Sequence, residues 1–174
     1  MAEKVNIQKD LKLKQESIFD MPELYKLMYR WTKQHNYSEF IEDEYVEKIS
    51  GDAKNLEIAW TCIRKINDYV KAYIEIRFLV LGLSDIEVNI DNIKRKTNKG
   101  SIEMRFTAYL KTDYEDTWAA KPLTKFFRGL YDKYINKDFI TEYKKDVEAE
   151  LLEFMSEVKS FLNLYKFRGI SHKI

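Results

Sequence analysis

Apolar and polar residues alternate through the middle of the chain. Between Val70 and Val80 every second residue is apolar, and most of the residues between them are charged or tyrosine. A period of two is typical of strands that place one face on a core and the other toward water. Gly82 interrupts the pattern, which returns at Ile86–Ile90 and again at Ile102–Leu110. We therefore predict long antiparallel strands joined by tight turns between Tyr69 and Tyr114.

Two flanking segments show the same alternation with one interruption each. In residues 5–13 the apolar positions alternate with polar ones, and Lys9 breaks the apolar face. We predict an edge strand here, because a lysine directed inward discourages further pairing. Between residues 56 and 66 every even-numbered position is apolar except Arg64. Residues 67–68 (Asn-Asp) then predict a turn into the central stretch.

Residues 39–49 fit two structures. Ile41, Tyr45 and Ile49 are spaced for one face of a helix and equally for one face of a strand. We favour a strand, because Ser50-Gly51-Asp52 is typical of a hairpin turn that would follow it.

Helical signals lie near both ends of the chain. Asp20 is a suitable N-cap, Pro22 fits the first turn, and the residues from Leu24 to Trp31 are apolar at helical spacing, so a helix is predicted from about residue 20 to 36. Residues 114–121 predict a loop. Pro122 then begins a second helix, with an apolar face over residues 123–134.

The last predicted helix is the longest. From Phe139 to Tyr165 apolar residues recur every three or four positions, and about 28 residues at 1.5 Å each give a rod of roughly 40 Å. Further apolar residues widen this stripe, which implies broad packing. A strand, a helix, several strands and then helices predict an α+β fold, in which a curved antiparallel sheet packs against the long C-terminal helix. We expect a single domain over residues 1–165 and a short basic tail over residues 166–174.

This order of elements resembles the helix-grip arrangement of the START and polyketide-cyclase-like proteins. The resemblance implies a sheet that wraps the C-terminal helix around an apolar cavity. The chain also resembles small uncharacterised archaeal proteins in the stretches Met21–Trp31, Leu81–Val88 and Lys96–Gly100. That second resemblance implies no activity.

Composition narrows the class of protein. Apolar residues make up 45% and charged residues 34% of the 174 residues, which is typical of soluble globular domains. The formal charge of +1 gives no strong field toward nucleic acid or membranes. The longest apolar run, Phe78–Leu81, is too short to span a bilayer, and the N-terminus does not resemble a signal peptide. Cys62 is the only cysteine, so we expect a cytoplasmic protein without disulfides.

No catalytic or cofactor motif is present in the sequence. Cys62, His35 and His172 are too far apart to form a ligand-spaced zinc cluster, and Cys62 lies on the apolar parity of a strand, which predicts a buried inert thiol. Glycine-rich phosphate loops and the GxSxG motif are absent. We therefore predict no catalytic residue, metal or cofactor.

Three clusters remain as candidate surfaces, each with a plainer structural interpretation. An acidic run is either a docking face for a basic partner or solvated surface: Glu39, Glu42, Asp43, Glu44 and Glu47. A basic loop is either a nucleic-acid contact, which we consider the weaker interpretation, or a hairpin tip: Lys94, Arg95, Lys96 and Lys99. Four phenylalanines form an apolar pocket, an interface or simply core: Phe126, Phe127, Phe154 and Phe161.

The sequence favours a non-catalytic protein-binding or self-assembly module, because extended strands and broad aromatic stripes are present while catalytic motifs are not. The alternative is a helix-grip carrier of a small apolar ligand. A second alternative is an enzyme with an unrecognised carboxylate site. The number of protomers separates the first hypothesis from the carrier.

Overall fold

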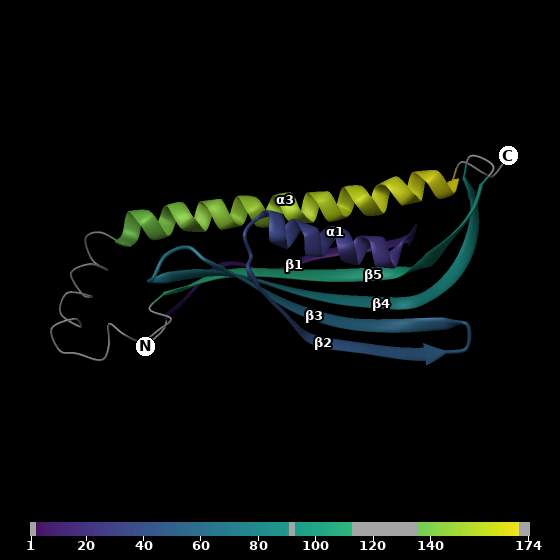
Figure 1. Ribbon diagram of the computed structural model, residues 1–174, viewed down its shortest axis with the longest axis horizontal. Coiled ribbons are helices and arrows are strands. Elements are labelled where there is room, and N and C mark those ends of the chain that lie inside the picture. Colours follow the sequence, from purple (N-terminus) through teal and green to yellow (C-terminus); the bar gives the residue numbers. More distant parts are fainter. Residues whose placement is uncertain (1–2, 91–92, 113–135, 171–174) are drawn as a thin grey trace.

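A computed structural model describes residues 3–90, 93–112 and 136–170 of the chain. Within these ranges the predicted α+β fold is confirmed (Figure 1). The elements in chain order are β1 (Glu3–Phe19), α1 (Met21–Gln34), β2 (Glu39–Ser50), β3 (Ala53–Lys65), β4 (Val70–Ile90), β5 (Ile93–Thr112) and α3 (Asn136–Ile170).

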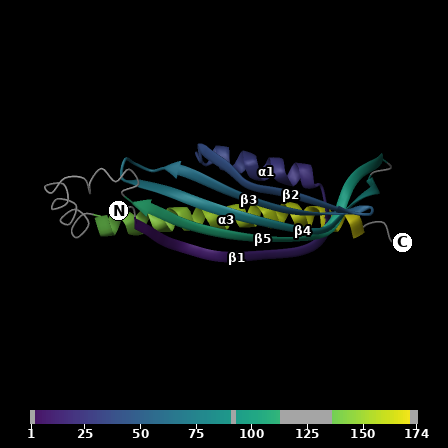
Figure 2. The ribbon, with the colours of Figure 1, turned by 90° about the horizontal axis from the view of Figure 1, so that it is seen from below.

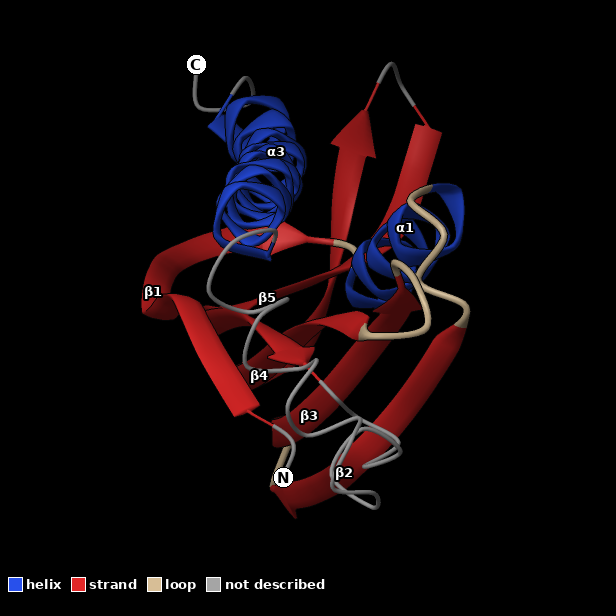
Figure 3. Ribbon diagram, turned by 90° about the vertical axis from the view of Figure 1, so that its left-hand side faces the viewer, coloured by secondary structure: helices blue, strands red, loops and turns tan. Residues whose placement is uncertain are grey.

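The five strands form one antiparallel sheet in the order β1-β5-β4-β3-β2. The first strand therefore lies beside the last, and β1 and β2 are the two edges. The far ends of β4 and β5 bend toward the C-terminal end of α3 (Figure 1). Figure 3 shows α1 and α3 on the same side of the sheet. The described helices thus cover one face of the sheet, as the alternating pattern predicted.

The predicted edge strand is confirmed, and it is longer than expected. The register of β1 with β5 shifts between Asn6 and Gln8 and again between Gln8 and Leu11, and Asp10 has a φ of 53°. These β-bulges accommodate the interruption at Lys9. The extra residues in β1 let the apolar residues that follow point toward the helices again. As a result Leu11 lies opposite Phe106, whose side chain is fully buried.

The helix α1 begins where the sequence predicted. The Asp20 carboxylate accepts a hydrogen bond from the backbone N–H of Glu23 at 2.9 Å, which satisfies one of the free donors of the first turn. Tyr25 of α1 contacts the Trp60 ring of β3 edge-on at 4.6 Å between centroids. The α1 helix therefore covers the β3 side of the sheet, while α3 packs mainly on β1.

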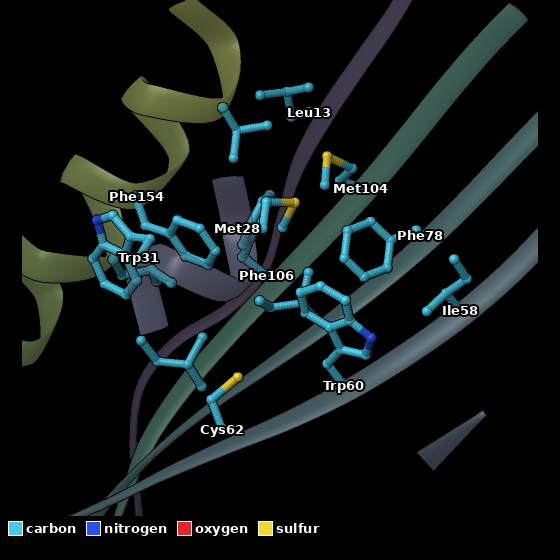
Figure 4. Close-up of a cluster of buried hydrophobic side chains, with 14 of the residues drawn as sticks. Leu13, Met28, Trp31, Ile58, Trp60, Cys62, Phe78, Met104, Phe106 and Phe154 are labelled. Carbon is cyan, nitrogen blue, oxygen red and sulfur yellow. The ribbon is translucent and has the colours of Figure 1, made fainter. Parts of the chain in front are cut away.

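The space between the helices and the sheet is filled with large side chains. Trp31 of α1 stacks on Phe154 of α3 with 4.1 Å between ring centroids, and Phe106 of β5 meets Phe154 edge-on at 5.8 Å. Beside them, Trp60 and Phe78 pack edge-on at 4.9 Å (Figure 4). Phe154 is therefore part of the packed core between the helices and the sheet.

The exposed apolar residues of α3 do not form a continuous face. The buried stripe of α3 consists of Val147, Leu151, Phe154, Val158 and Leu162. The exposed apolar residues Phe139, Leu152 and Leu164 lie roughly 100–120° away from this stripe, on opposite sides, at 100° per residue. Phe161 is partly buried against the core. Self-association through this helix is therefore not favoured by its described residues.

Arg64, the exception to the parity of β3, has a structural role. Its register partner is the buried Ala72, so its side chain points to the helix side. The guanidinium donates to a Glu150 carboxylate oxygen of α3 at 2.7 Å and to the backbone carbonyl of His35 at 3.3 Å. Tyr37 also donates its hydroxyl to Glu150, at 3.0 Å. Burial, and then the nearby Glu150, raise the pKa of Tyr37 well above its usual range. This cluster joins β3, α3 and the segment after α1.

Several predictions about boundaries need correction. Residues 94–99 belong to strand β5 and do not form a loop, because they pair with residues 84–89 of β4. The α3 helix extends to Ile170, so residues 166–170, which were assigned to the basic tail, are helical. Phe126, Phe127, the loop predicted over 114–121 and the helix predicted from Pro122 lie outside the described residues.

The strand favoured for residues 39–49 is confirmed as β2, followed by a turn in which Gly51 has a φ of 61°. The prediction that its apolar residues share one face is wrong, because the register shifts between Glu42 and Glu44. Ile41 lies opposite Thr61 on the face away from the helices. Tyr45 lies opposite the buried Ile58.

Candidate functional site

The sheet face away from the helices is covered by no other element among residues 3–90, 93–112 and 136–170. We call it the open face; Figure 2 shows the strands in front of α3 from this side. It is built from the polar half of each alternating pattern, so every second residue of five strands contributes. Its central positions are Thr61 on β3, Glu75 and Arg77 on β4, and Arg105 and Thr107 on β5.

The strand register places residues of the same kind directly opposite one another, in rows that run across the sheet. Four lysines, from β1, β5, β4 and β3, lie directly opposite one another: Lys4, Lys111, Lys71 and Lys65. Like charges in opposite positions are destabilising unless they are balanced. The Lys71 ammonium lies 3.0 Å from the Glu39 carboxylate, and that of Lys65 lies 2.6 Å from Asp68. The row is therefore partly neutralised within the chain.

The next row contains two stacked tyrosines. Tyr73 and Tyr109 are nearly parallel, with 4.8 Å between ring centroids, and the Lys4 ammonium lies 3.5 Å above the Tyr109 ring. The Tyr109 hydroxyl donates to Glu75 at 2.9 Å. Burial and this hydrogen bond raise the pKa of Tyr109 well above its usual range. The phenol stays neutral at physiological pH and serves as a hydrogen-bond donor.

A third row is cationic and less balanced. Lys12, Arg105 and Arg77 lie directly opposite one another on β1, β5 and β4. One carboxylate, Glu103, accepts from the Arg105 guanidinium at 3.2 and 3.1 Å and lies 2.9 Å from the Lys12 ammonium. The hydrogen bond from Lys12, assisted by Arg105, lowers the pKa of Glu103. Arg77 is exposed and makes no hydrogen bond or ion pair with a described residue.

Two hollows lie on the open face and share Glu75, Arg77 and Arg105. The larger is a groove of about 870 Å³ across β2, β3, β4 and β5, with a floor that includes Ala59 and Thr61. The smaller, of about 430 Å³, extends to the bulged part of β1. Both are open depressions of a strongly charged surface.

The five residues of the predicted acidic docking face are not brought together. Glu42 and Glu47 point to the helix side, whereas Glu39, Asp43 and Glu44 belong to the open face. Four of the five have intramolecular partners. Glu42 accepts from the Tyr25 hydroxyl and the Trp60 indole, Asp43 accepts from Thr61, and Glu39 and Glu47 pair with lysines. Within the described chain, Glu44 has no hydrogen bond or salt bridge.

The predicted basic cluster lies on both sides of the far end of β5. All four side chains are exposed: Lys94, Arg95, Lys96 and Lys99. Alternate positions of a strand point to opposite faces, so Arg95 is separated from Lys94 and Lys96. Lys96 also lies opposite Glu87 in the register. The described geometry therefore does not gather these charges into one patch.

Cys62 is buried on the helix side of β3, with no exposed surface. Burial raises the pKa of its thiol to about 12. The thiolate is the reactive species, and at neutral pH almost none is present. The arrangement of the thiol fits the predicted inert role.

We expect Cys62 to resist iodoacetamide in the folded protein and to react fully once the chain is unfolded in denaturant. Intact-mass spectrometry measures this directly, because the chain has a single cysteine and each carbamidomethyl adduct reports one site. Modification of the native protein as fast as of the unfolded chain would contradict the buried position of the thiol.

Among the described residues, no group of three or more His, Cys, Asp or Glu side chains is placed to hold a metal ion. In the same part of the chain, no helix combines the length and apolar character needed to cross a membrane. The chain matches no protein-family model, no curated protein and no solved structure. The resemblances to helix-grip and archaeal proteins therefore stay predictions.

Sequence reasoning missed the open face as a site. Its residues are far apart in sequence and come together only through strand register. The available signal was the polar half of the alternation, in particular Tyr73, Glu75 and Arg77 facing Arg105, Thr107 and Tyr109. That signal identifies a solvent-facing surface, but it does not say which residues become neighbours.

Proposed function

We propose that this chain is a non-catalytic self-association module that pairs through the open faces of two copies. The main observation is the division of charge on that face. On β1 and β5 the open face carries more cations than carboxylates. The cations are Lys4, Lys12, Lys14, Arg105 and Lys111, and the carboxylates are Glu16 and Glu103. On β2 and β3 the open face carries more carboxylates than cations. The carboxylates are Glu39, Asp43, Glu44 and Glu57, and the cations are Lys48 and Lys65.

This division makes the face self-complementary. A two-fold axis parallel to the strands, between two open faces, places the β1 side of one copy against the β2 side of the other. Lys12 of one copy then faces Glu44 of the other on both sides of the axis, because these two residues lie at opposite ends of one cross-strand row, as an isologous interface requires. β4 lies at the centre and contributes Leu79 and Leu81, which are exposed.

The size of the face is sufficient for a stable dimer. Five strands spaced by about 4.8 Å, each with about 13 residues at 3.3 Å, give roughly 1,000 Å². Standard protein interfaces bury about 800 Å² per partner. The single cysteine of the chain also agrees with a cytoplasmic location, which we include in the proposal.

Charge reversal on each side of the face tests the proposal. We expect the wild-type chain to be dimeric at micromolar concentration in native mass spectrometry. The variant Lys12→Glu and the variant Glu44→Lys should each be monomeric, because like charges then meet across the axis. A mixture of the two should form the heterodimer, since each reversed side faces the other.

The matched control reverses exposed charges on the solvent side of α3, Glu157→Lys and Lys159→Glu, and should leave the dimer intact. A monomeric wild type, or charge-reversed variants that dimerise as well as the wild type, would overturn the proposal. A monomer bearing an apolar adduct would instead favour the carrier hypothesis.

A further inference from the structure

The smaller hollow of the open face has a lining suited to an anion. It is bounded by β1, β5 and β4, and its lining includes four cations and two carboxylates. The lining residues are Lys4, Asn6, Lys9, Asp10, Glu75, Arg77, Arg105 and Thr107. Of the two carboxylates, Glu75 already accepts the Tyr109 hydroxyl. The local charge is therefore positive, although the whole chain is nearly neutral.

Two guanidinium groups meet in this hollow without enough counter-charge. Arg77 and Arg105 are register partners on neighbouring strands, where like charges repel. Among the described residues Arg105 pairs with one carboxylate, Glu103, which it shares with Lys12. Arg77 has no hydrogen bond or ion pair with residues 3–90, 93–112 or 136–170. An anion between the two guanidiniums would remove the repulsion and supply the missing partner.

The donor set matches the oxygens of a phosphate group. Guanidinium groups donate two parallel hydrogen bonds to phosphate oxygens, and two of them balance a doubly charged anion. The Thr107 hydroxyl accepts from the Asp10 backbone N–H at 3.2 Å, so its own proton is free to donate. Lys4 and Lys9 add charge at the rim.

The backbone beside the hollow is distorted in a way that suits a binding site. Two register shifts of β1 flank this wall, and Asp10 has a φ of 53°, in the left-handed region. β-Bulges next to binding sites redirect side chains, and residues with unusual backbone angles concentrate at such sites. The bulges bring Lys9 and Asp10 to the rim of the hollow.

We propose that this hollow binds the phosphate group of a small molecule, held between Arg77 and Arg105. Its volume of about 430 Å³ exceeds the space that inorganic phosphate needs and falls within the range of small-molecule sites. All of its residues come from one chain, so the site forms without self-association, but it lies on the open face that the proposed dimer would cover.

The test is a titration with inorganic phosphate at constant ionic strength, with chloride as the replaced anion. We expect a saturable rise in melting temperature for the wild type, because a ligand of the folded state stabilises it. Arg77→Gln should lose this saturable shift. Without phosphate its melting temperature should equal or exceed that of the wild type, since a like-charge contact is removed.

Lys99→Gln is the matched control, because Lys99 is an exposed cation of β5 outside the hollow, and it should retain the full response. Nitrogen-15 NMR of the guanidinium N–H groups gives a second measurement, in which phosphate should shift the Arg77 and Arg105 signals together. No saturable shift in either the wild type or the monomeric variant Glu44→Lys, or an equal shift in Arg77→Gln, would overturn the proposal.

Co-flotation with vesicles distinguishes the source of the phosphate. Binding to inorganic phosphate and to phosphatidic acid vesicles, with both lost in Arg77→Gln, would assign a lipid headgroup. Binding to inorganic phosphate without co-flotation would assign a free small molecule. Because the proposed dimer would cover the hollow, the titration is repeated with the monomeric variant Glu44→Lys, in which every residue of the hollow is intact. The two tests stay distinguishable, because this variant should bind phosphate whether or not the wild type forms a dimer.

Discussion

We expect Phe154→Ala to lower the free energy of unfolding by about 3–5 kcal/mol, the usual loss for a buried phenylalanine truncated to alanine. Phe154 has no exposed surface and contacts two aromatic rings, Trp31 of α1 and Phe106 of β5. Removing its ring leaves a cavity where α1, α3 and the sheet meet, and rigid neighbours cannot collapse into it. Chemical denaturation followed by circular dichroism measures the change.

Leu152→Ala is the matched control, since Leu152 lies on the same helix and is 51% exposed. We expect a change of less than about 0.5 kcal/mol, as for most surface substitutions. The comparison also separates core from pocket. If Phe154 lined an open ligand cavity, its truncation would remove few contacts and the two variants would unfold at similar denaturant concentrations.

The second large effect is expected at the ion pair of Arg64 and Glu150. We expect Glu150→Ala to cost about 2–3 kcal/mol, because it leaves the Arg64 guanidinium and the Tyr37 hydroxyl without their acceptor. This is less than for a fully buried pair, since these two side chains are 19% and 21% exposed and water screens part of the charge. Equilibrium denaturation measures the loss.

Arg64→Ala with Glu150→Ala completes a double-mutant cycle. The double variant should be less destabilised than the sum of the single variants, because no unpaired charge remains. Glu157→Ala, an exposed carboxylate on the same helix, should leave stability nearly unchanged. Strictly additive single effects would show that the two side chains do not interact.

The local features of the fold could be predicted from the sequence. Period-two alternation located the strands, because a half-buried strand must alternate. Asp20 and Pro22 located the start of α1, because capping depends on residues adjacent in sequence. The stretch at residues 94–99 was misassigned to a loop, since it carries polar residues on both faces of the strand and has no apolar period to reveal it.

The candidate site could not be predicted, because it depends on register and on bulges. The Arg77–Arg105 pair requires that residues 28 positions apart become direct neighbours, which alternation does not determine. A single extra residue in β2 was enough to separate Ile41 from Tyr45. Arg64 appeared only as an exception to a pattern, and its partner lies 86 positions away on a different type of element.

The pairing of β1 with β5 leaves β1 without its strand partner until about a hundred further residues have been synthesised. Glu3 pairs with Thr112, and the side chain of Gln15 reaches Asn163 of α3. The hairpins from β2 to β5 join neighbours in sequence and pay little loop-closure entropy, whereas β1 must wait for a strand about a hundred residues away. While the chain emerges from the ribosome, the apolar half of β1 therefore has neither its strand partner nor its covering helix. During that interval it depends on the lysines at positions 4, 9, 12 and 14 to remain unpaired with other chains.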